Sequence, residues 1–167
     1  HYEACAQGLV CRAEKPRPYR DYIAWLQKQD LDEANRFWRD YLRDFSTPTP
    51  LAYDRPPQGL ADQNDDAADH CVHLSPDLTA RLTTLAQQHR VTPNTFVQGA
   101  WAILLAYYSG ERDVLFGVTV AGRPTQLLGV ESVLGLFINT LPLRVSVAPE
   151  RPVLAWLKDL LAENIRL

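Results

Sequence analysis

Asn139 and Thr140 are the strongest candidates for chemistry in this sequence, because a carboxamide and a hydroxyl interrupt the otherwise apolar run from Gly135 to Arg144. A carboxamide buried without a hydrogen-bond partner costs about 1–3 kcal/mol. Asn139 is therefore expected either to hold a neighbouring loop in place or to face a wet channel. The sequence alone leaves these two alternatives open.

A second segment of interest is Gly122-Arg123-Pro124, which ends the β-branched run from Val114 to Val120. Glycine allows a close approach of backbone that other residues prevent. This exit is interpreted either as an ordinary strand end or as the wall of a channel, and the spacing favours the ordinary strand end.

The aromatic cluster in Tyr19-Arg20-Asp21-Tyr22-Ile23-Ala24-Trp25 surrounds a single carboxylate. Aromatic side chains mostly stabilise proteins by burying large areas. The pattern favours the first turns of a helix whose aromatic side chains pack on the core, while Asp21 accepts hydrogen bonds.

Metal-binding and nucleophilic sites receive little support from the remaining residues. In the sequence Asp69-His70-Cys71-Val72-His73, strand alternation would send His70 to the face opposite Cys71 and His73, which leaves too few convergent metal ligands. Ser109 has no nucleophile-elbow pattern around it, and the sequence has no adjacent pair of histidines and no phosphate-binding glycine loop. No metal site and no self-contained catalytic centre are expected.

The helices that must position these residues are marked by apolar periodicity and capping residues. The pattern from Tyr19 to Phe45 is helical, and Asp30 predicts that its second part begins near Leu31. Ser75-Pro76 predicts a helix to about His89, and Pro152 starts another. Thr92-Pro93 opens a helix, ended by Gly110, that is apolar almost all round and is therefore expected to be buried.

Three strands are predicted between the helices. Cys71 to Leu74 is predicted to form a short strand, Val114 to Val120 a central strand covered on both faces, and Leu141 to Val147 a half-buried strand. The predicted fold class is α/β, with a two-layer mixed sheet packed with helices. Residues 47–69, rich in proline and polar residues, are predicted to form a crossing loop.

Composition excludes several classes of protein. The chain has 167 residues, of which 46% are hydrophobic, so it has enough apolar residues for one compact domain. The net charge of -3, without dense clusters of Lys or Arg, argues against nucleic acid as a partner. The longest apolar run, Val97 to Tyr108, is too short for a membrane span. Cys5, Cys11 and Cys71 lack CxxC spacing and predict free thiols in a cytoplasmic protein.

Taken in order, the segments resemble condensation domains of nonribosomal peptide synthetases. YRDYIAW at 19–25 resembles the YxDYAxW motif of that family, and VLGLFINTLPLRV at 133–145 resembles its GxFVNTxxxR motif. FWRDYL at 37–42, the segment from Trp101 and FGVTVAGRP at 116–124 are also similar to family segments in the same order.

The resemblance implies a chloramphenicol-acetyltransferase-like half-domain. It assigns residues 1–167 to the C-terminal subdomain of a condensation domain, truncated at both ends, with a helical lead-in at 1–46, the crossing loop at 47–69 and a mixed α/β core at 70–167. The family's HHxxxDG motif, whose second histidine is implicated in peptide-bond formation, does not occur in the sequence. The isolated chain is therefore expected to be inactive.

For the whole domain, the resemblance implies that a donor acyl or peptidyl thioester is joined to the amine of a carrier-bound aminoacyl acceptor. Substrates would arrive on phosphopantetheine of peptidyl carrier proteins, with no cofactor bound directly. The other implied partners are an adjacent adenylation domain and the N-terminal half of the same domain, with no nucleic acid and no membrane.

The resemblance also implies a role for each motif residue. Asn139, Thr140, Gly135 and Phe137 would line the tunnel or face the substrate, and Gly122 and Arg123 would lie on a loop that bridges the two halves. The implied structural residues are Tyr19, Asp21, Tyr22, Trp25 and Arg144. None of these residues is assigned as the base.

Other functions stay open beside this one. The GLFINT form favours peptide-forming condensation over epimerisation and heterocyclisation relatives. A carrier-protein or inter-subdomain binding module without turnover, and a stand-alone acyltransferase of the same fold, are the remaining alternatives.

Overall fold

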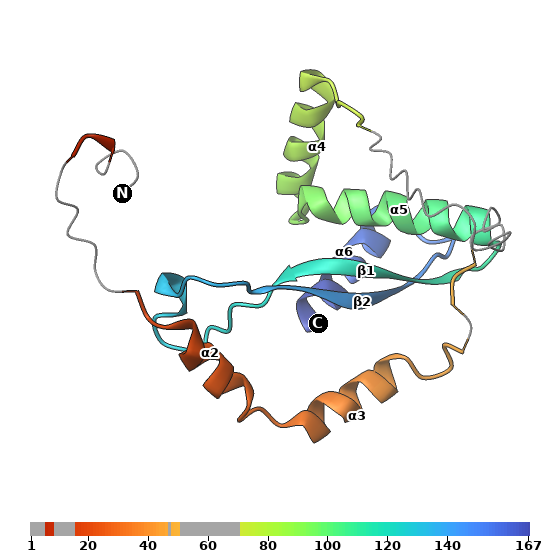
Figure 1. Ribbon diagram of the computed structural model, residues 1–167. Coiled ribbons are helices and arrows are strands. Elements are labelled where there is room, and N and C mark those ends of the chain that lie inside the picture. Colours follow the sequence, from red (N-terminus) through yellow and green to blue (C-terminus); the bar gives the residue numbers. More distant parts are fainter. Residues whose placement is uncertain (1–5, 9–15, 47, 51–70) are drawn as a thin grey trace, which may run out of the picture. The chain divides into compact units, whose positions relative to one another are not determined.

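The computed structural model describes residues 6–8, 16–46, 48–50 and 71–167 (Figure 1). The chain divides into two compact units: His1–Arg43 with Thr119–Thr140, and Asp44–Val118 with Leu141–Leu167. We name them the motif unit and the helical unit. The predictions for Cys5, Cys11, His70 and most of the crossing loop fall outside the described residues, whereas Cys71 is described and is a free, exposed thiol.

Among the described residues before the crossing loop, the chain forms the helices α2 (Tyr19–Leu26) and α3 (Leu31–Tyr41). α3 begins where the sequence predicts, because the Asp30 carboxylate accepts hydrogen bonds from the backbone N–H groups of Asp32 at 2.9 Å and Glu33 at 3.1 Å. On its apolar face, Tyr41 is buried and stacks on Phe37 with ring centroids 5.7 Å apart.

The helical unit contains α4 (Pro76–His89), α5 (Pro93–Ser109) and α6 (Val153–Arg166). The predicted starts are confirmed: Ser75 accepts from the Leu78 N–H at 3.2 Å, and Thr92 and Thr95 cap each other reciprocally. Gly110 ends α5 in the left-handed conformation, with φ of 74°. α5 packs on α6 at Gly99, where a β-carbon would lie 2.6 Å from the Leu157 side chain.

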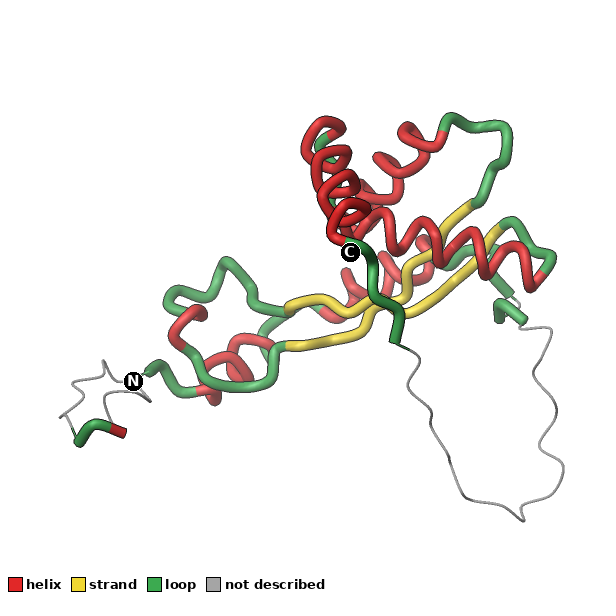
Figure 2. The backbone as a smooth tube through the Cα atoms, turned by 90° about the horizontal axis from the view of Figure 1, so that it is seen from above, coloured by secondary structure: helices red, strands yellow, loops and turns green. Residues whose placement is uncertain are grey.

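The strands β1 (Asp113–Ala121) and β2 (Ile138–Ser146) pair in one sheet (Figure 2). Backbone hydrogen bonds join Gly122 to Phe137 at one end of the pair and Val147 to Arg112 at the other, so the strands are antiparallel. The two anchors are separated by the same number of residues on both strands, so the register contains no bulge. Between β1 and β2 lies the short 3₁₀ helix η1 (Val130–Ser132).

The prediction that the first strand is central and covered on both faces is wrong for this chain. The described residues give β1 a single partner, β2, and its burial alternates: Val114 and Val118 are buried, whereas Gly117 and Thr119 are exposed. An apolar, β-branched run shows that a strand is able to bury both of its faces. The described part of the chain, however, covers only one face of β1.

The short strand predicted at Cys71 to Leu74 is also wrong. These residues have no regular structure and are all exposed. A strand needs a backbone partner to form its ladder, and the described residues pair no strand with this segment. The residues instead lead into the Ser75 cap of α4.

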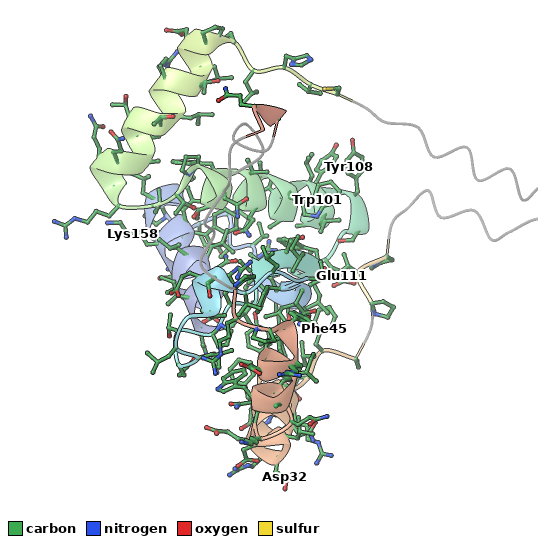
Figure 3. The ribbon with its side chains drawn as sticks, turned by 60° about the vertical axis from the view of Figure 1, so that its left-hand side comes forward. Asp32, Phe45, Trp101, Tyr108, Glu111 and Lys158 are labelled. Carbon is green, nitrogen blue, oxygen red and sulfur yellow. The ribbon has the colours of Figure 1, made fainter. Side chains whose placement is uncertain are left out.

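Helix α5 has the predicted bounds but not the predicted all-round burial. Thr95, Gly99, Ala102 and Leu105 form its buried face. The side chains of Trp101 and Tyr108 project from α5 in Figure 3, and each is 48% exposed. Within the described residues, no helix combines the length and apolarity needed to cross a membrane.

We predict that the isolated chain self-associates or binds a hydrophobic dye. Soluble monomers rarely expose apolar patches larger than a few hundred Å², and large apolar side chains are exposed on α5, among them Val97, Trp101, Ile103, Leu104 and Tyr107. Light scattering and dye fluorescence measure the effect, and replacing Trp101 and Tyr107 by Gln should reduce it. Addition of the N-terminal half implied by the motifs should also suppress it. A chain that stays monomeric and does not raise the fluorescence of the dye would contradict the prediction.

Candidate functional site

The candidate site is built around the connection between the two strands, residues 122–137, which we name the motif loop. The Gly122 N–H donates to the Phe137 carbonyl at 2.7 Å and closes the loop at its base. A β-carbon on residue 122 would lie 2.8 Å from that same carbonyl oxygen. Glycine is therefore required for this close approach.

Arg123 braces the motif loop through backbone carbonyls. Its Nη1 donates to the carbonyls of Val130 at 2.6 Å and Val133 at 3.1 Å. Its guanidinium carbon also lies 4.1 Å from the centre of the Phe137 ring, within the range of a cation–π contact. One side chain thus ties together both ends of η1 and the last residue of the loop.

The apolar side of the motif loop forms a small core. Leu127, Val130, Val133 and Phe137 are buried, and Tyr19, Tyr22 and Trp25 of α2 pack against them. Phe137 meets Tyr19 edge to face at 5.5 Å and lies 4.7 Å from the Tyr22 ring, centroid to centroid. The two strongest sequence motifs therefore meet in one cluster.

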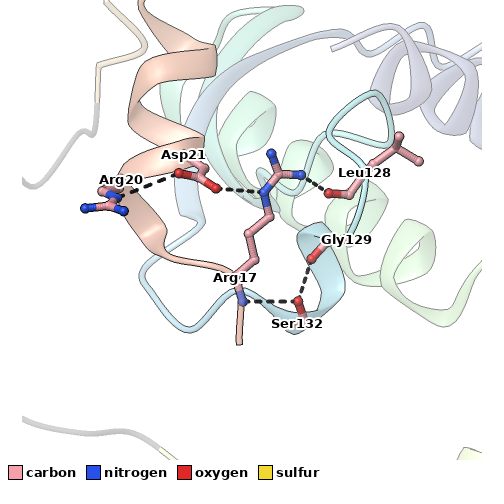
Figure 4. Close-up of polar contacts among 6 residues, drawn as sticks. All are labelled: Arg17, Arg20, Asp21, Leu128, Gly129 and Ser132. Atoms are coloured by element: carbon pink, nitrogen blue, oxygen red, sulfur yellow. Dashed lines mark hydrogen bonds and ion pairs between the residues drawn. The ribbon is translucent and has the colours of Figure 1, made fainter. Parts of the chain in front are cut away.

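Polar contacts from the start of α2 add to this core (Figure 4). The Arg17 guanidinium donates to Asp21 at 2.9 Å and to the carbonyl of Leu128, and the Arg17 N–H reaches the Ser132 hydroxyl at 3.5 Å. Arg20 lies 3.9 Å from the other oxygen of Asp21. Arg17 lies outside the predicted motifs. The sequence gives no signal for its role, because its partners in the motif loop are more than a hundred residues further along the chain.

Gly135 lies directly against Tyr19. A β-carbon on residue 135 would be 2.1 Å from Cδ2 of the Tyr19 ring, so any other residue would displace the ring. The Tyr19 hydroxyl donates to the Leu136 carbonyl at 2.7 Å. The GLFINT segment is therefore held by α2 immediately before it enters β2.

Asn139 and Thr140 lie at the start of β2 and are exposed, so the expectation of a buried carboxamide is wrong for this chain. Asn139 accepts from the Thr140 N–H at 2.8 Å, which is a local contact and holds no other loop. The side chain is exposed because the described residues place no layer over the first three residues of β2.

Arg144 lies in the helical unit, near the other end of β2. Its guanidinium binds both carboxylate oxygens of Asp113, with Nη2 to Oδ2 at 2.6 Å and Nε to Oδ1 at 3.1 Å, and stacks at 5.4 Å from Phe45. Sequence reasoning missed Thr49, whose hydroxyl accepts from the Leu115 N–H at 2.9 Å and also contacts the Leu115 carbonyl. These contacts hold the segment that follows α3 to the edge of β1, within the helical unit.

Metal ligands do not converge in the part of the chain that the structure describes. His73 and Cys71 lie 3.6 Å apart, side chain to side chain, in an exposed segment. An apolar pocket of about 270 Å³ lies beside Trp156, Ile103 and Val153, with Arg151 as its charged lining residue. Arg151 is paired with Asp159 at 2.5 Å, so the pocket has no convergent set of catalytic groups.

A family model described as the condensation domain matches residues 1–166. The chain belongs to the condensation domain family. The fold and the meeting of the two motifs agree with this assignment.

Curated relatives are much longer than this condensation-domain chain. It is 48% identical over 159 residues to a linear gramicidin synthase protein of Brevibacillus parabrevis, and the match covers 95% of this chain and 3% of that protein. It is 45% identical to chondramide synthase cmdD of Chondromyces crocatus, covering 98% of this chain and 4% of that protein. The chain therefore spans a few per cent of the length of these relatives.

Solved structures with the same fold include the first condensation domain of the calcium-dependent antibiotic synthetase in complex with a substrate analogue. It has a TM-score of 0.71, 19% identity and coverage of 99% of this chain and 36% of that chain. SgcC5 from Streptomyces globisporus has a TM-score of 0.72 and 18% identity, covering 98% of this chain and 37% of that one. The predicted α/β class and chloramphenicol-acetyltransferase-like fold are confirmed.

Proposed function

We propose that this chain is the C-terminal half of a condensation domain that joins a carrier-bound donor acyl or peptidyl thioester to the amine of a carrier-bound aminoacyl acceptor. The observation that carries the proposal is the match of the condensation family model to residues 1–166, supported by nonribosomal peptide synthetase relatives over nearly the whole chain.

In the proposed reaction, the acceptor amine attacks the donor thioester carbonyl. The new C–N bond forms, the carrier thiolate leaves, and the amine proton passes to a base or to solvent. Positioning the two substrates supplies a large part of such a rate, since well-oriented neighbours can reach effective molarities of about 10⁵–10⁸ M. Among the residues of this chain, we assign Asn139 and Thr140 to the substrate side. Gly135 and Phe137, which the resemblance also placed there, pack instead against the Tyr19 ring and hold the segment in place.

The partners and carriers are part of the same proposal. Substrates arrive on phosphopantetheine arms of peptidyl carrier proteins, and no cofactor is bound by this chain itself. The N-terminal half of the domain supplies the HHxxxDG histidines, an adenylation domain lies nearby in the synthetase, and the protein is cytoplasmic. The sparse cysteines and the free thiol of Cys71 support the last point.

We expect Asn139→Ala in the whole parent domain to lower turnover about tenfold. One hydrogen bond to a reacting or bound group is worth about 0.5–1.5 kcal/mol, or more when the group is charged. Because Asn139 is exposed in this chain, its loss should leave the melting temperature nearly unchanged. Dipeptide formation and thermal unfolding are measured together, with Ser146→Ala, another exposed β2 residue, as control. Unchanged turnover would contradict the assignment of Asn139.

A binding module without turnover is the second candidate, because no adjacent histidine pair occurs in the sequence. The parent gene separates the two functions. An intact HHxxxDG motif in the N-terminal half supports the enzyme, whereas a degenerate motif supports binding alone. Separately, a parent protein without carrier or adenylation domains would support a stand-alone acyltransferase.

A further inference from the structure

We propose that Tyr19 is a positioning residue for Asn139, acting through the backbone of the GLFINT segment rather than only filling the core. This inference rests on the proposed function, because it assigns Tyr19 a role in the same reaction. The juxtaposition that carries it is the contact of one tyrosine side chain with three consecutive residues just before β2.

Each of these three residues is held in a different way. The Tyr19 ring occupies the space over Gly135 that a β-carbon would fill. Its hydroxyl donates to the Leu136 carbonyl at 2.7 Å. Its ring meets Phe137 edge to face with centroids 5.5 Å apart. Tyr19 therefore fixes the position, and not merely the burial, of this stretch of backbone.

The path from Leu136 to Asn139 is short and has little freedom. Phe137 is buried, its carbonyl is bonded to the Gly122 N–H, and its ring is covered by Arg123. β2 begins at the next residue, Ile138. Only Phe137 and Ile138 separate Leu136 from Asn139, so a shift of the Leu136 carbonyl would be passed on to Asn139.

The Asn139 side chain is oriented so that its amide group can bind a hydrogen-bond acceptor. Its Oδ1 accepts from the Thr140 N–H at 2.8 Å, which fixes the orientation of the carboxamide. Among the described residues, its amide nitrogen has no acceptor, and the residue is exposed. The amide N–H groups can therefore donate to a carbonyl oxygen, such as that of a thioester or its tetrahedral adduct.

Tyr22 provides a matched control within the same helix and cluster. Its ring packs 4.7 Å from the Phe137 ring and 5.4 Å from the Tyr19 ring, centroid to centroid. No hydrogen bond from its hydroxyl is present within the described residues, so Tyr22→Phe removes a hydroxyl without removing a contact of this kind. The comparison isolates the bond from Tyr19 to Leu136.

The test measures single-turnover formation of the dipeptidyl carrier product by the whole parent synthetase, with both carrier proteins loaded. Tyr19→Phe keeps the ring and removes the hydroxyl. We expect the rate constant at saturating substrate to fall about three- to tenfold, the value of one hydrogen bond of about 0.7–1.4 kcal/mol. Tyr22→Phe should stay within about 1.5-fold of the wild type, because it removes no hydrogen bond and keeps the packed ring.

A double-mutant cycle with Asn139→Ala separates positioning from general packing. If Tyr19 acts through Asn139, Tyr19→Phe should change the rate less than about twofold when Asn139 is already Ala. Additive losses, equal losses in both Tyr→Phe variants, or no loss in Tyr19→Phe would each overturn the inference while leaving the proposed function in place. A wild-type synthetase that makes no dipeptide would instead overturn the proposed function, and this inference with it.

Discussion

The 167-residue chain, incubated alone with loaded donor and acceptor carrier proteins, should form no dipeptidyl thioester above the background without protein. Its four histidines are His1, His70, His73 and His89, and no two are adjacent. His73 is exposed beside Cys71, and His89 is the last residue of α4. Within the described residues, neither imidazole has a carboxylate partner that would orient it as a base. A reaction that needs two aligned substrates also loses most of its rate when one wall of the site is missing.

The measurement is mass spectrometry of the carrier proteins after a long incubation. The whole parent domain, at the same concentration, is the positive control. Mixing the chain with its separately expressed N-terminal half should restore part of the activity. Product from the chain alone would show that a base lies within these 167 residues and that the catalytic histidines were wrongly assigned to the other half.

Gly135→Ala should destabilise the motif unit by about 1–3 kcal/mol, the usual cost of forcing extra volume into a packed site. The added methyl group would lie 2.1 Å from Cδ2 and 2.5 Å from Cε2 of the Tyr19 ring. The ring has little room to move, since its hydroxyl is bonded to Leu136 and its edge contacts Phe137. The cost should therefore come from displaced packing and a lost hydrogen bond.

Urea unfolding of the chain, followed by far-ultraviolet circular dichroism, measures this effect. Leu134→Ala is the control, because Leu134 is next to Gly135 and 77% exposed, and it should change stability by less than about 0.5 kcal/mol. In a Tyr19→Ala background the methyl group has space, so Gly135→Ala should cost much less there. An equal cost in both backgrounds would show that the Tyr19 ring is not what excludes a side chain at residue 135.

Local features of the fold were predictable from the sequence. Asp30, Ser75 and Thr92 each cap a helix at the predicted place, because a capping residue acts on backbone within three residues of itself. Gly110 ends α5 for the same local reason.

Features that depend on distant partners were predicted less well. Cys71 to Leu74 has strand composition, yet a strand forms only where another strand is available to pair with it. The apolar patterns of β1 and α5 identify surfaces that can be buried, but not which segments cover them. The predicted burial on all sides therefore failed for Trp101 and for Gly117.

In the candidate site, too, residues marked by a local pattern were predicted, whereas residues that depend on distant partners were not. The motif residues Tyr19, Gly135 and Phe137 were found by their pattern, and the structure brings them into one cluster. Arg17 and Thr49 were missed, because a side chain that bonds to a backbone carbonyl or N–H far along the sequence leaves no periodic signal. The exposure of Asn139 could not be predicted either, since it depends on what covers the start of β2.

The bond between Gly122 and Phe137 has a consequence for which substitutions the motif loop can accept. The loop is closed at its base by this bond, so the pairing register of β1 and β2 is held there whatever residues stand at the exposed loop positions. Thr125, Gln126 and Leu134 are exposed and can be exchanged without sliding β1 along β2, whereas Leu127, Val130 and Val133 are buried in the core. A slide of one residue would turn every strand side chain to the wrong face, so protein engineers can vary these exposed positions while the strand pair stays a constant frame.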